Sequence, residues 1–281
     1  MINKICIIGA GTMGCGIAQV AAQSGFATLL YDVNEVMLEK AKSTIYASLQ
    51  YLANKQKITA EEKEQTLKRI QFSNRIENCM ADIFIEAIIE NTAAKTSIFN
   101  QLAIINKTDA VFATNTSSLS ISQIQEATKF PERVIGMHFF NPAPVMKLVE
   151  VVEGAKTNAK TTGIIIALAQ QMGKTSVLCK DSPGFIVNRV ARQYYLEAMK
   201  LVENGMATFE EVDTIMEASG FKMGPFRLMD LIGIDINLAV STSIYESFQE
   251  ERFKPSRIQI DKVKKGALGK KTGKGFYNYT G

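Results

Sequence analysis

The chain has 281 residues, a formal net charge of +4, 46% apolar and 21% charged residues, which is typical of a globular protein with one large domain or two modest ones. No apolar run is as long as a membrane span and no basic cluster indicates nucleic-acid binding, so we expect neither a membrane nor a nucleic acid as partner. The cysteines are scattered without a CxxC and there is a single histidine, so we expect reduced thiols and no metal site.

The first predicted element begins almost at the first residue. Residues 4–8, KICII, end at the glycine turn GAGTMG, and a helical pattern then leads to a short apolar run that ends at Asp32. The order strand, glycine turn, helix, strand predicts a βαβ unit. Because this strand starts so early, we expect no signal or transit peptide and a cytoplasmic protein.

A helical hairpin is predicted next, near residues 34–70, with one helix over 34–54 and a second that begins at the capping-box pattern Thr59–Glu62. Strand-like runs follow at 82–88, 110–115, 133–139, 147–154 and 175–180, and helical segments alternate with them at 93–105, 120–127 and 157–172. This alternation predicts a Rossmann-type α/β fold with a doubly wound, mostly parallel sheet.

The pattern changes after DSPGF, residues 181–185, where comparable strand-like runs end. Residues 186–204 predict a long helix, TFEE at 208–211 begins another, and residues 230–248 predict one buried helix. We therefore predict two domains, an α/β domain over 1–183 and an all-α domain over 184–281.

The glycine turn has the spacing GxGxxG between a strand and a helix, with Asp32 at the end of the next strand. Gly9 permits the tight turn, Gly11 lets a pyrophosphate approach the backbone, and Gly14 lets the helix pack on the strand. Asp32 would accept hydrogen bonds from ribose hydroxyls and repel a 2′-phosphate, so NAD is favoured over NADP. The residues expected to bind it are Gly9, Gly11, Thr12, Met13, Gly14 and Asp32. A glycine-rich turn without a ligand is the alternative.

The histidine, His138, ends the strand-like run 133–139. Ligands of such sheets bind outside the carboxyl ends of the strands, so we expect the imidazole there, with Ser117 after the preceding strand. Glu150 lies between two valines in a strand that runs back into the sheet, and a buried carboxylate needs a partner. A Glu–His pair would fix the imidazole tautomer and exchange protons near neutral pH.

Several motifs together resemble the 3-hydroxyacyl-CoA dehydrogenase family, in particular its bacterial 3-hydroxybutyryl-CoA dehydrogenases. They span nearly the whole chain in the family's order: GAGTMGCGIAQ, EAIIENTAAKTSIF, ATNTSSLSIS, GMHFFNPAPVMKLVEVV, DSPGFIVNRV and GKKTGKGFYNY. Cys15 is a small departure, because the family usually has a smaller residue after the third glycine. The resemblance implies NAD-dependent oxidation of a short-chain (S)-3-hydroxyacyl-CoA, and a homodimer formed through the helical domain.

The resemblance also implies the roles of individual residues. His138 resembles the general base and Glu150 its partner, while Ser117 and Asn188 resemble hydrogen-bond donors near the substrate oxygen. Ser48 and Lys55 resemble contacts with coenzyme A. Further positions resemble contacts with NAD or its surroundings, namely Glu90, Lys95, Asn115, Ser117, Asn141 and Lys274.

Each of these residues also has a structural alternative. His138 could be a satisfied core histidine and Ser117 a helix cap, and Glu150 could pair with Lys147 or an arginine. The other polar residues could be ordinary helix surface, which applies to Glu90 and Lys95, to Ser48 and Lys55, and to Asn188.

Three other functions are weighed against the dehydrogenase. A Ser117–His138–Glu150 thioester hydrolase would lack the GxSxG turn and leave the glycine loop idle. A noncatalytic NAD-binding protein would bind NADH without turnover. The β-hydroxyacid dehydrogenases, which act on free acids, share the glycine loop but rely on a lysine, and the MHFFNPAP block argues against them.

Overall fold

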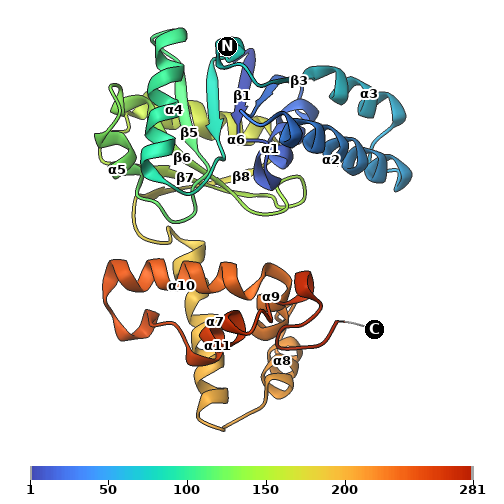
Figure 1. Ribbon diagram of the computed structural model, residues 1–281, viewed down its shortest axis with the longest axis vertical. Helices are drawn as coiled ribbons and strands as arrows, with labels where there is room; N and C mark the ends of the chain where they lie inside the picture. The colour runs from blue at the N-terminus through green and yellow to red at the C-terminus, as the bar shows by residue number, and fades with distance from the viewer. Residues whose placement is uncertain (1, 280–281) are drawn as a thin grey trace. The chain divides into compact units, whose positions relative to one another are not determined.

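A computed structural model describes residues 2–279. The chain divides into two compact units, Met1–Asp181 and Ser182–Gly281 (Figure 1). Each unit is built around its own apolar core.

The N-terminal unit contains an eight-stranded sheet with the strand order β3-β2-β1-β4-β5-β6-β7-β8. Its strands are β1 (Lys4–Ile8), β2 (Ala27–Tyr31), β3 (Ile70–Ser73), β4 (Ile83–Glu86), β5 (Val111–Thr114), β6 (Val134–Phe139), β7 (Leu148–Glu153) and β8 (Thr175–Lys180). Neighbouring strands pair in parallel except β6 and β7, which are antiparallel. The carboxyl ends of β1, β4, β5 and β6 therefore share one edge of the sheet.

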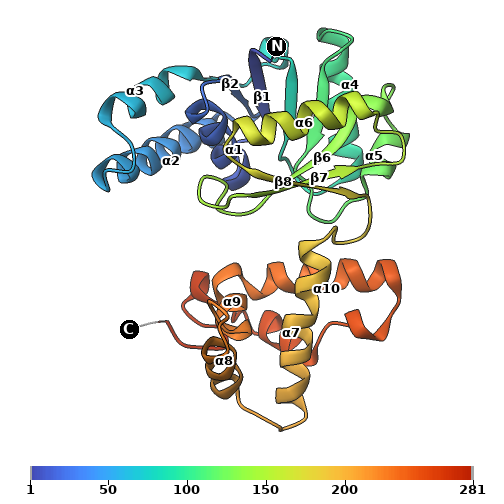
Figure 2. The same cartoon turned by 180° about the vertical axis from the view of Figure 1, so that it is seen from behind.

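Helices cover both faces of this sheet. They are α1 (Thr12–Gln23), α2 (Glu35–Asn54), α3 (Ala60–Arg69), α4 (Thr92–Ile105), α5 (Ile121–Glu126) and α6 (Ala159–Gln171). Side chains such as Ile17 of α1 and Ile165 of α6 share one core with Ile7 and Ile85 of the strands, and Figure 2 shows α6 lying across this face. On the other face, Phe99 of α4 packs against Phe112 of β5, with 5.4 Å between the centroids of the two rings. The predicted Rossmann-type, mostly parallel fold is confirmed.

The short strand β3 was not predicted. It follows α3 directly, because Ile70 is both the residue after the last helical residue and the first residue of the strand. The four residues IQFS pair with β2 at the edge of the sheet. With no glycine or proline between helix and strand, the sequence carries no boundary signal there.

The C-terminal unit is helical, as predicted. Its helices are α7 (Val187–Glu203), α8 (Phe209–Ala218), α9 (Pro225–Ile232), α10 (Ile234–Phe248) and α11 (Arg257–Lys264). The core includes Leu196 and Met199 of α7, together with Phe226 of α9 and Phe276 near the C-terminus. Leu196 and Met199 lie three positions apart on α7, which is the spacing of apolar residues on the buried face of a helix.

The single helix predicted over 230–248 is wrong. The structure breaks it at Gly233, which has a φ of +108°, so that α9 and α10 meet at a bend of 100°. A positive φ suits glycine and cannot continue a right-handed helix. Among residues 2–279 no single helix is long and apolar enough to cross a membrane, and only this bent pair has the length and composition to do so together.

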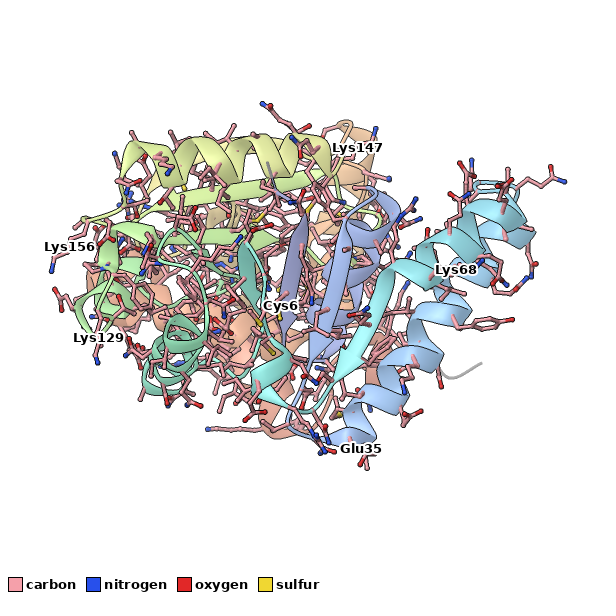
Figure 3. The ribbon with its side chains drawn as sticks, turned by 90° about the horizontal axis from the view of Figure 1, so that it is seen from above. Cys6, Glu35, Lys68, Lys129, Lys147 and Lys156 are labelled. Carbon is pink, nitrogen blue, oxygen red and sulfur yellow. The ribbon has the colours of Figure 1, made fainter. Side chains whose placement is uncertain are left out.

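The four cysteines are free thiols, and Cys6, Cys15 and Cys79 are buried. Figure 3 shows Cys6 among the inner side chains of the sheet, whereas the labelled Glu35 and Lys68 lie at the periphery. Burial and the neighbouring Cys79 thiol raise the pKa of Cys6. Such a thiol stays protonated and behaves as a core residue.

Candidate functional site

The glycine loop joins β1 to α1 with very little space around two of its glycines. A Cβ on Gly9 would lie 2.7 Å from the Ala87 carbonyl oxygen, and one on Gly14 would lie 1.7 Å from the Gly9 carbonyl oxygen. Gly11 is different, because apart from Gly11 itself and its two chain neighbours no described heavy atom lies within 4 Å of the position of its Cβ. The loop is thus tightly packed below and open at Gly11, as close approach of a ligand to the backbone requires.

The first turn of α1 is also suited to an anion. Gly11 is its N-cap, and no side chain in residues 2–279 caps it, whereas Asn34 and Asn91 cap α2 and α4 with their side-chain oxygens. The N–H groups at Thr12 and Met13 belong to this uncapped turn, where helix N–H groups have no intrahelical acceptor. Such a turn binds phosphate groups well, so this chain fits the pyrophosphate of a dinucleotide.

Asp32 follows β2 and lies beside the glycine loop. Its Oδ2 accepts a hydrogen bond of 2.8 Å from the Ala10 N–H, and its Oδ1 accepts one of 2.9 Å from the Asn34 N–H. An ionised carboxylate can accept about four hydrogen bonds. The carboxylate therefore holds the loop and retains capacity for ribose hydroxyls.

A cavity of about 240 Å³ opens beside the loop, between α1, α2 and residues 141–144. Ser48 and Asn141 both line it, together with Gly11 and Thr12. Lys55 lies at the far end of α2, where it is exposed and its ammonium is 5.9 Å from the centroid of the Tyr51 ring.

His138 and Glu150 face each other across the antiparallel strands β6 and β7. The register pairs the two residues, and His138 Nδ1 lies 2.7 Å from Glu150 Oε2. Both side chains are buried, with 6% and 1% of their surface exposed. The strand expected to run back into the sheet is β7, and its antiparallel pairing with β6 places Glu150 opposite His138. A carboxylate at Nδ1 selects the tautomer with its proton there, so that Nε2 is the acceptor nitrogen of the neutral ring.

The residues after β5 form the next part of this edge. Asn115 Oδ1 accepts a hydrogen bond of 2.9 Å from the N–H of Phe139, the residue after His138. The Ser117 N–H donates to Glu90 Oε1 at 3.1 Å. Asn115 thus joins the loop that carries Ser117 to the strand that carries His138.

Glu90 and Lys95 belong to a network of charges. Lys95, with 1% of its surface exposed, lies 2.6 Å from Glu86 Oε1 and 3.2 Å from Glu90 Oε2. Burial alone would raise the pKa of Glu90, but Lys95 and the hydroxyls of Thr116 and Ser118 lower it below its usual range. Glu90 is therefore held as a carboxylate, and the Lys95 ammonium is occupied by two acidic partners.

Two predicted residues belong to the C-terminal unit. Asn188 lies in the first turn of α7, where its carbonyl oxygen accepts a hydrogen bond of 3.4 Å from Arg192 Nε. Lys274 is exposed in the loop before the C-terminus, where its carbonyl oxygen accepts from the Gly269 N–H. Their contacts with substrate and NAD stay predictions.

Sequence reasoning missed Glu86, Thr116 and Lys174. Glu86 ends β4 within an apolar run, so the argument that singled out Glu150 applies to it equally. Lys174 Nζ donates to the carbonyl oxygens of Ala143 at 2.6 Å and Met146 at 2.8 Å, and so holds the loop after β6. No pattern around Lys174 marks it in the sequence, and Thr116 lies in the motif ATNTSSLSIS without a feature that separates it from the neighbouring hydroxyl residues.

Both units match models of one protein family. The 3-hydroxyacyl-CoA dehydrogenase NAD binding domain matches residues 4–182, and the 3-hydroxyacyl-CoA dehydrogenase C-terminal domain matches residues 184–279. These matches confirm the resemblance inferred from the motifs.

Individual relatives match over the full chain. The 3-hydroxyadipyl-CoA dehydrogenase of Escherichia coli is 46% identical over 99% of this chain, and the chain spans 59% of that protein's length. The probable 3-hydroxybutyryl-CoA dehydrogenase of Bacillus subtilis is 43% identical over 99% of this chain and 98% of its own length. The crystal structure of (S)-3-hydroxybutyryl-CoA dehydrogenase from Ralstonia eutropha superposes with a TM-score of 0.95 at 38% identity, covering 100% of both chains.

Proposed function

Because the chain belongs to the 3-hydroxyacyl-CoA dehydrogenase family, we propose that it interconverts an (S)-3-hydroxyacyl-CoA and the 3-ketoacyl-CoA, with NAD as the cofactor. The observation that carries this proposal is the buried contact of 2.7 Å between His138 and Glu150. It lies at the same sheet edge as the glycine loop, where substrate and dinucleotide can meet.

His138 has the role of acid and base. With Nδ1 facing Glu150, Nε2 takes the proton of the 3-hydroxyl in oxidation and returns it in reduction. Glu150 stabilises the imidazolium that forms, because its carboxylate is buried against the ring, where water screens the attraction between the two charges only weakly. General acid–base help of this kind contributes typically about 10²–10⁴-fold in rate.

Ser117 and Asn188 are proposed to hydrogen-bond the substrate oxygen. Charge on this oxygen changes as its proton and the hydrogen on the neighbouring carbon are transferred, so fixed donors lower the barrier. Support for Ser117 comes from its loop, which Asn115 ties to the strand of His138. Support for Asn188 is the family motif at the start of α7.

NAD supplies the hydride acceptor when it is bound. We propose that the open backbone at Gly11 and the first turn of α1 hold its pyrophosphate, and that Asp32 accepts from its ribose. Glu90, Asn115 and Asn141 would line the rest of the NAD site, and Lys95 would act through Glu90. Lys274 of the C-terminal unit is proposed as a further contact with NAD.

The cavity beside α2 is the proposed place for part of the coenzyme A group. Lys40, Thr44 and Ser48 all line it, and their spacing of four residues puts them on one face of the helix. An ammonium and two hydroxyls suit a phosphate. Lys55 extends this proposal to the end of the same helix.

The names of the relatives, the surface of the helical unit and the free thiols support three further proposals, on substrate size, assembly and location. Short acyl chains are proposed because the relatives in Bacillus subtilis and Ralstonia eutropha are named for 3-hydroxybutyryl-CoA. Self-association through the helical unit is proposed from its exposed apolar side chains, including Phe221, Leu231 and Ile236. A cytoplasmic location is proposed from the free thiols.

The test is NADH consumption with acetoacetyl-CoA and with longer 3-ketoacyl-CoA substrates. His138→Gln should leave the Kd for NADH unchanged and lower kcat by about 10²–10⁴-fold. Near-normal turnover of His138→Gln would remove the acid–base role. Steady release of coenzyme A thiol without NADH would instead favour a thioester hydrolase.

A further inference from the structure

Five residues form a closed ring of polar contacts at the ends of β4 and β5, with four links between side chains and one through a backbone N–H. Glu86 Oε1 lies 2.6 Å from Lys95 Nζ, and Lys95 Nζ lies 3.2 Å from Glu90 Oε2. Glu90 Oε1 accepts from the Thr116 hydroxyl, and the Thr116 N–H donates to the Thr114 hydroxyl at 3.3 Å. The Thr114 hydroxyl closes the ring by donating to Glu86 Oε2 at 2.7 Å.

Four of the five ring residues are buried, whereas 37% of the Glu90 side chain is exposed. Glu86 and Thr114 have no exposed surface, and Lys95 and Thr116 each expose 1%. A buried ion pair is a poor source of stability, because desolvation of the two charges offsets most of their attraction. The Glu86–Lys95 pair instead fixes local geometry, because Glu86 also accepts a hydrogen bond of 2.6 Å from the Ile88 N–H and so holds the turn after β4.

The side of the ring facing the site holds the backbone around Ser117. The Thr116 hydroxyl accepts from the Leu119 N–H at 2.9 Å and from the Ser118 N–H at 3.3 Å. Glu90 Oε1 accepts from the Ser117 N–H at 3.1 Å and from the Ser118 hydroxyl at 2.9 Å. The backbone on both sides of Ser117 is therefore fixed by two ring members, Thr116 and Glu90.

We propose that Glu86, Lys95 and Thr116 are positioning residues for Ser117, which they hold at the distance from the substrate oxygen that the reaction needs. The inference rests on the proposed function of Ser117. It also gives Lys95 a different task from contact with the cofactor, since two carboxylates occupy its ammonium. A displacement of about 1 Å in a reacting group can lower the rate by about 10²-fold.

Substitutions at Thr116 separate the hydroxyl from the rest of the side chain. Thr116→Val keeps the shape and removes the hydroxyl, whereas Thr116→Ser keeps the hydroxyl. Thr116→Val should lower kcat about 10- to 100-fold with little change in KM for NADH, and Thr116→Ser should restore most of it. Thr161→Val is the matched control. Thr161 lies on α6, away from this ring, is buried like Thr116, and donates its hydroxyl to the Glu132 carbonyl oxygen.

A double-mutant cycle tests whether the effect passes through Ser117. In a Ser117→Ala background, Thr116→Val should lower kcat by little more than Ser117→Ala alone, because the positioned group is already gone. A full additional loss would overturn the inference, as would wild-type kcat in Thr116→Val. The combined variant Glu86→Gln/Lys95→Met removes both buried charges together and should fold while losing kcat as Thr116→Val does. Wild-type kcat in that variant would exclude a role for the ion pair.

Amide hydrogen exchange tests the same device without catalysis. Thr116→Val should raise the exchange rates of the Ser118 and Leu119 N–H groups at least several-fold, and Thr161→Val should not. Unchanged exchange would overturn the inference. If exchange rises as expected but the wild-type protein reduces no 3-ketoacyl-CoA, the positioning device stands and the proposed function fails.

Discussion

Gly11→Ala should separate binding of the dinucleotide from stability of the fold. The new Cβ meets no described heavy atom within 4 Å beyond the adjacent residues of the chain, and the φ of Gly11 is −72°, which alanine adopts without strain. A poorer N-cap and a less flexible unfolded chain oppose each other, so the free energy of unfolding should change by less than about 1 kcal/mol. The methyl group fills the space that a pyrophosphate would use, so the Kd for NADH should rise about 10- to 100-fold, equivalent to about 1.4–2.8 kcal/mol.

Two other glycines serve as controls for this prediction, measured by NADH fluorescence titration and urea unfolding. Gly163 on α6 also has open space around its Cβ position, so Gly163→Ala should raise stability by up to about 1 kcal/mol and leave the Kd unchanged. Gly14→Ala would place a Cβ 1.7 Å from the Gly9 carbonyl oxygen and should destabilise the fold by about 3 kcal/mol or more. NADH binding of wild-type strength by Gly11→Ala would refute the placement of the pyrophosphate.

Three further predictions concern charge. Glu150→Gln should lower kcat, because the imidazole loses the carboxylate that fixes its tautomer, whereas Glu153→Gln on the same strand should leave kcat unchanged; equal kcat values in the two variants would mean that the His138–Glu150 pair has no role. Asp32→Arg should weaken NADH binding and improve NADPH binding, as measured by titration with both; an unchanged preference would contradict the ribose contact. Burial raises the pKa of Glu90 and Lys95 lowers it, with a net decrease, so the contribution of Glu90 to stability is complete above about pH 4.3 and is lost as pH falls through the depressed pKa. The difference in free energy of unfolding between wild type and Glu90→Gln, measured in urea, should therefore narrow from pH 7 to pH 3. A constant difference would refute this contribution.

Most of the sheet could be predicted because its strands are apolar runs that end at distinctive residues. The runs at 4–8 and 175–180 coincide with β1 and β8. Prediction failed where local pattern and backbone disagreed. Gly233 interrupts an apolar helical pattern that continues on both sides, and only its positive φ separates α9 from α10.

The candidate site was less accessible to sequence reasoning because its contacts depend on register and on helix orientation. Glu150 could be recognised as a carboxylate in need of a partner, but its position opposite His138 follows from the antiparallel pairing of β6 and β7. For Lys95 the sequence suggested a contact with NAD, with helix surface as the alternative. The structure buries its ammonium between Glu86, at the end of β4, and Glu90, in the loop before α4.

Asp32 and Glu86 are two carboxylates that each hold a loop, and only Asp32 is also proposed to bind a ligand. Both follow or end a parallel strand at the same sheet edge, and each accepts a backbone N–H two residues ahead, from Asn34 and Ile88 respectively. Asp32 remains half-buried, with lone pairs available to a ribose. Glu86 has no exposed surface, and three protein donors occupy its two oxygens. Both side chains are carboxylates at comparable positions, and their different burial is what supports the proposals of recognition for Asp32 and positioning for Glu86.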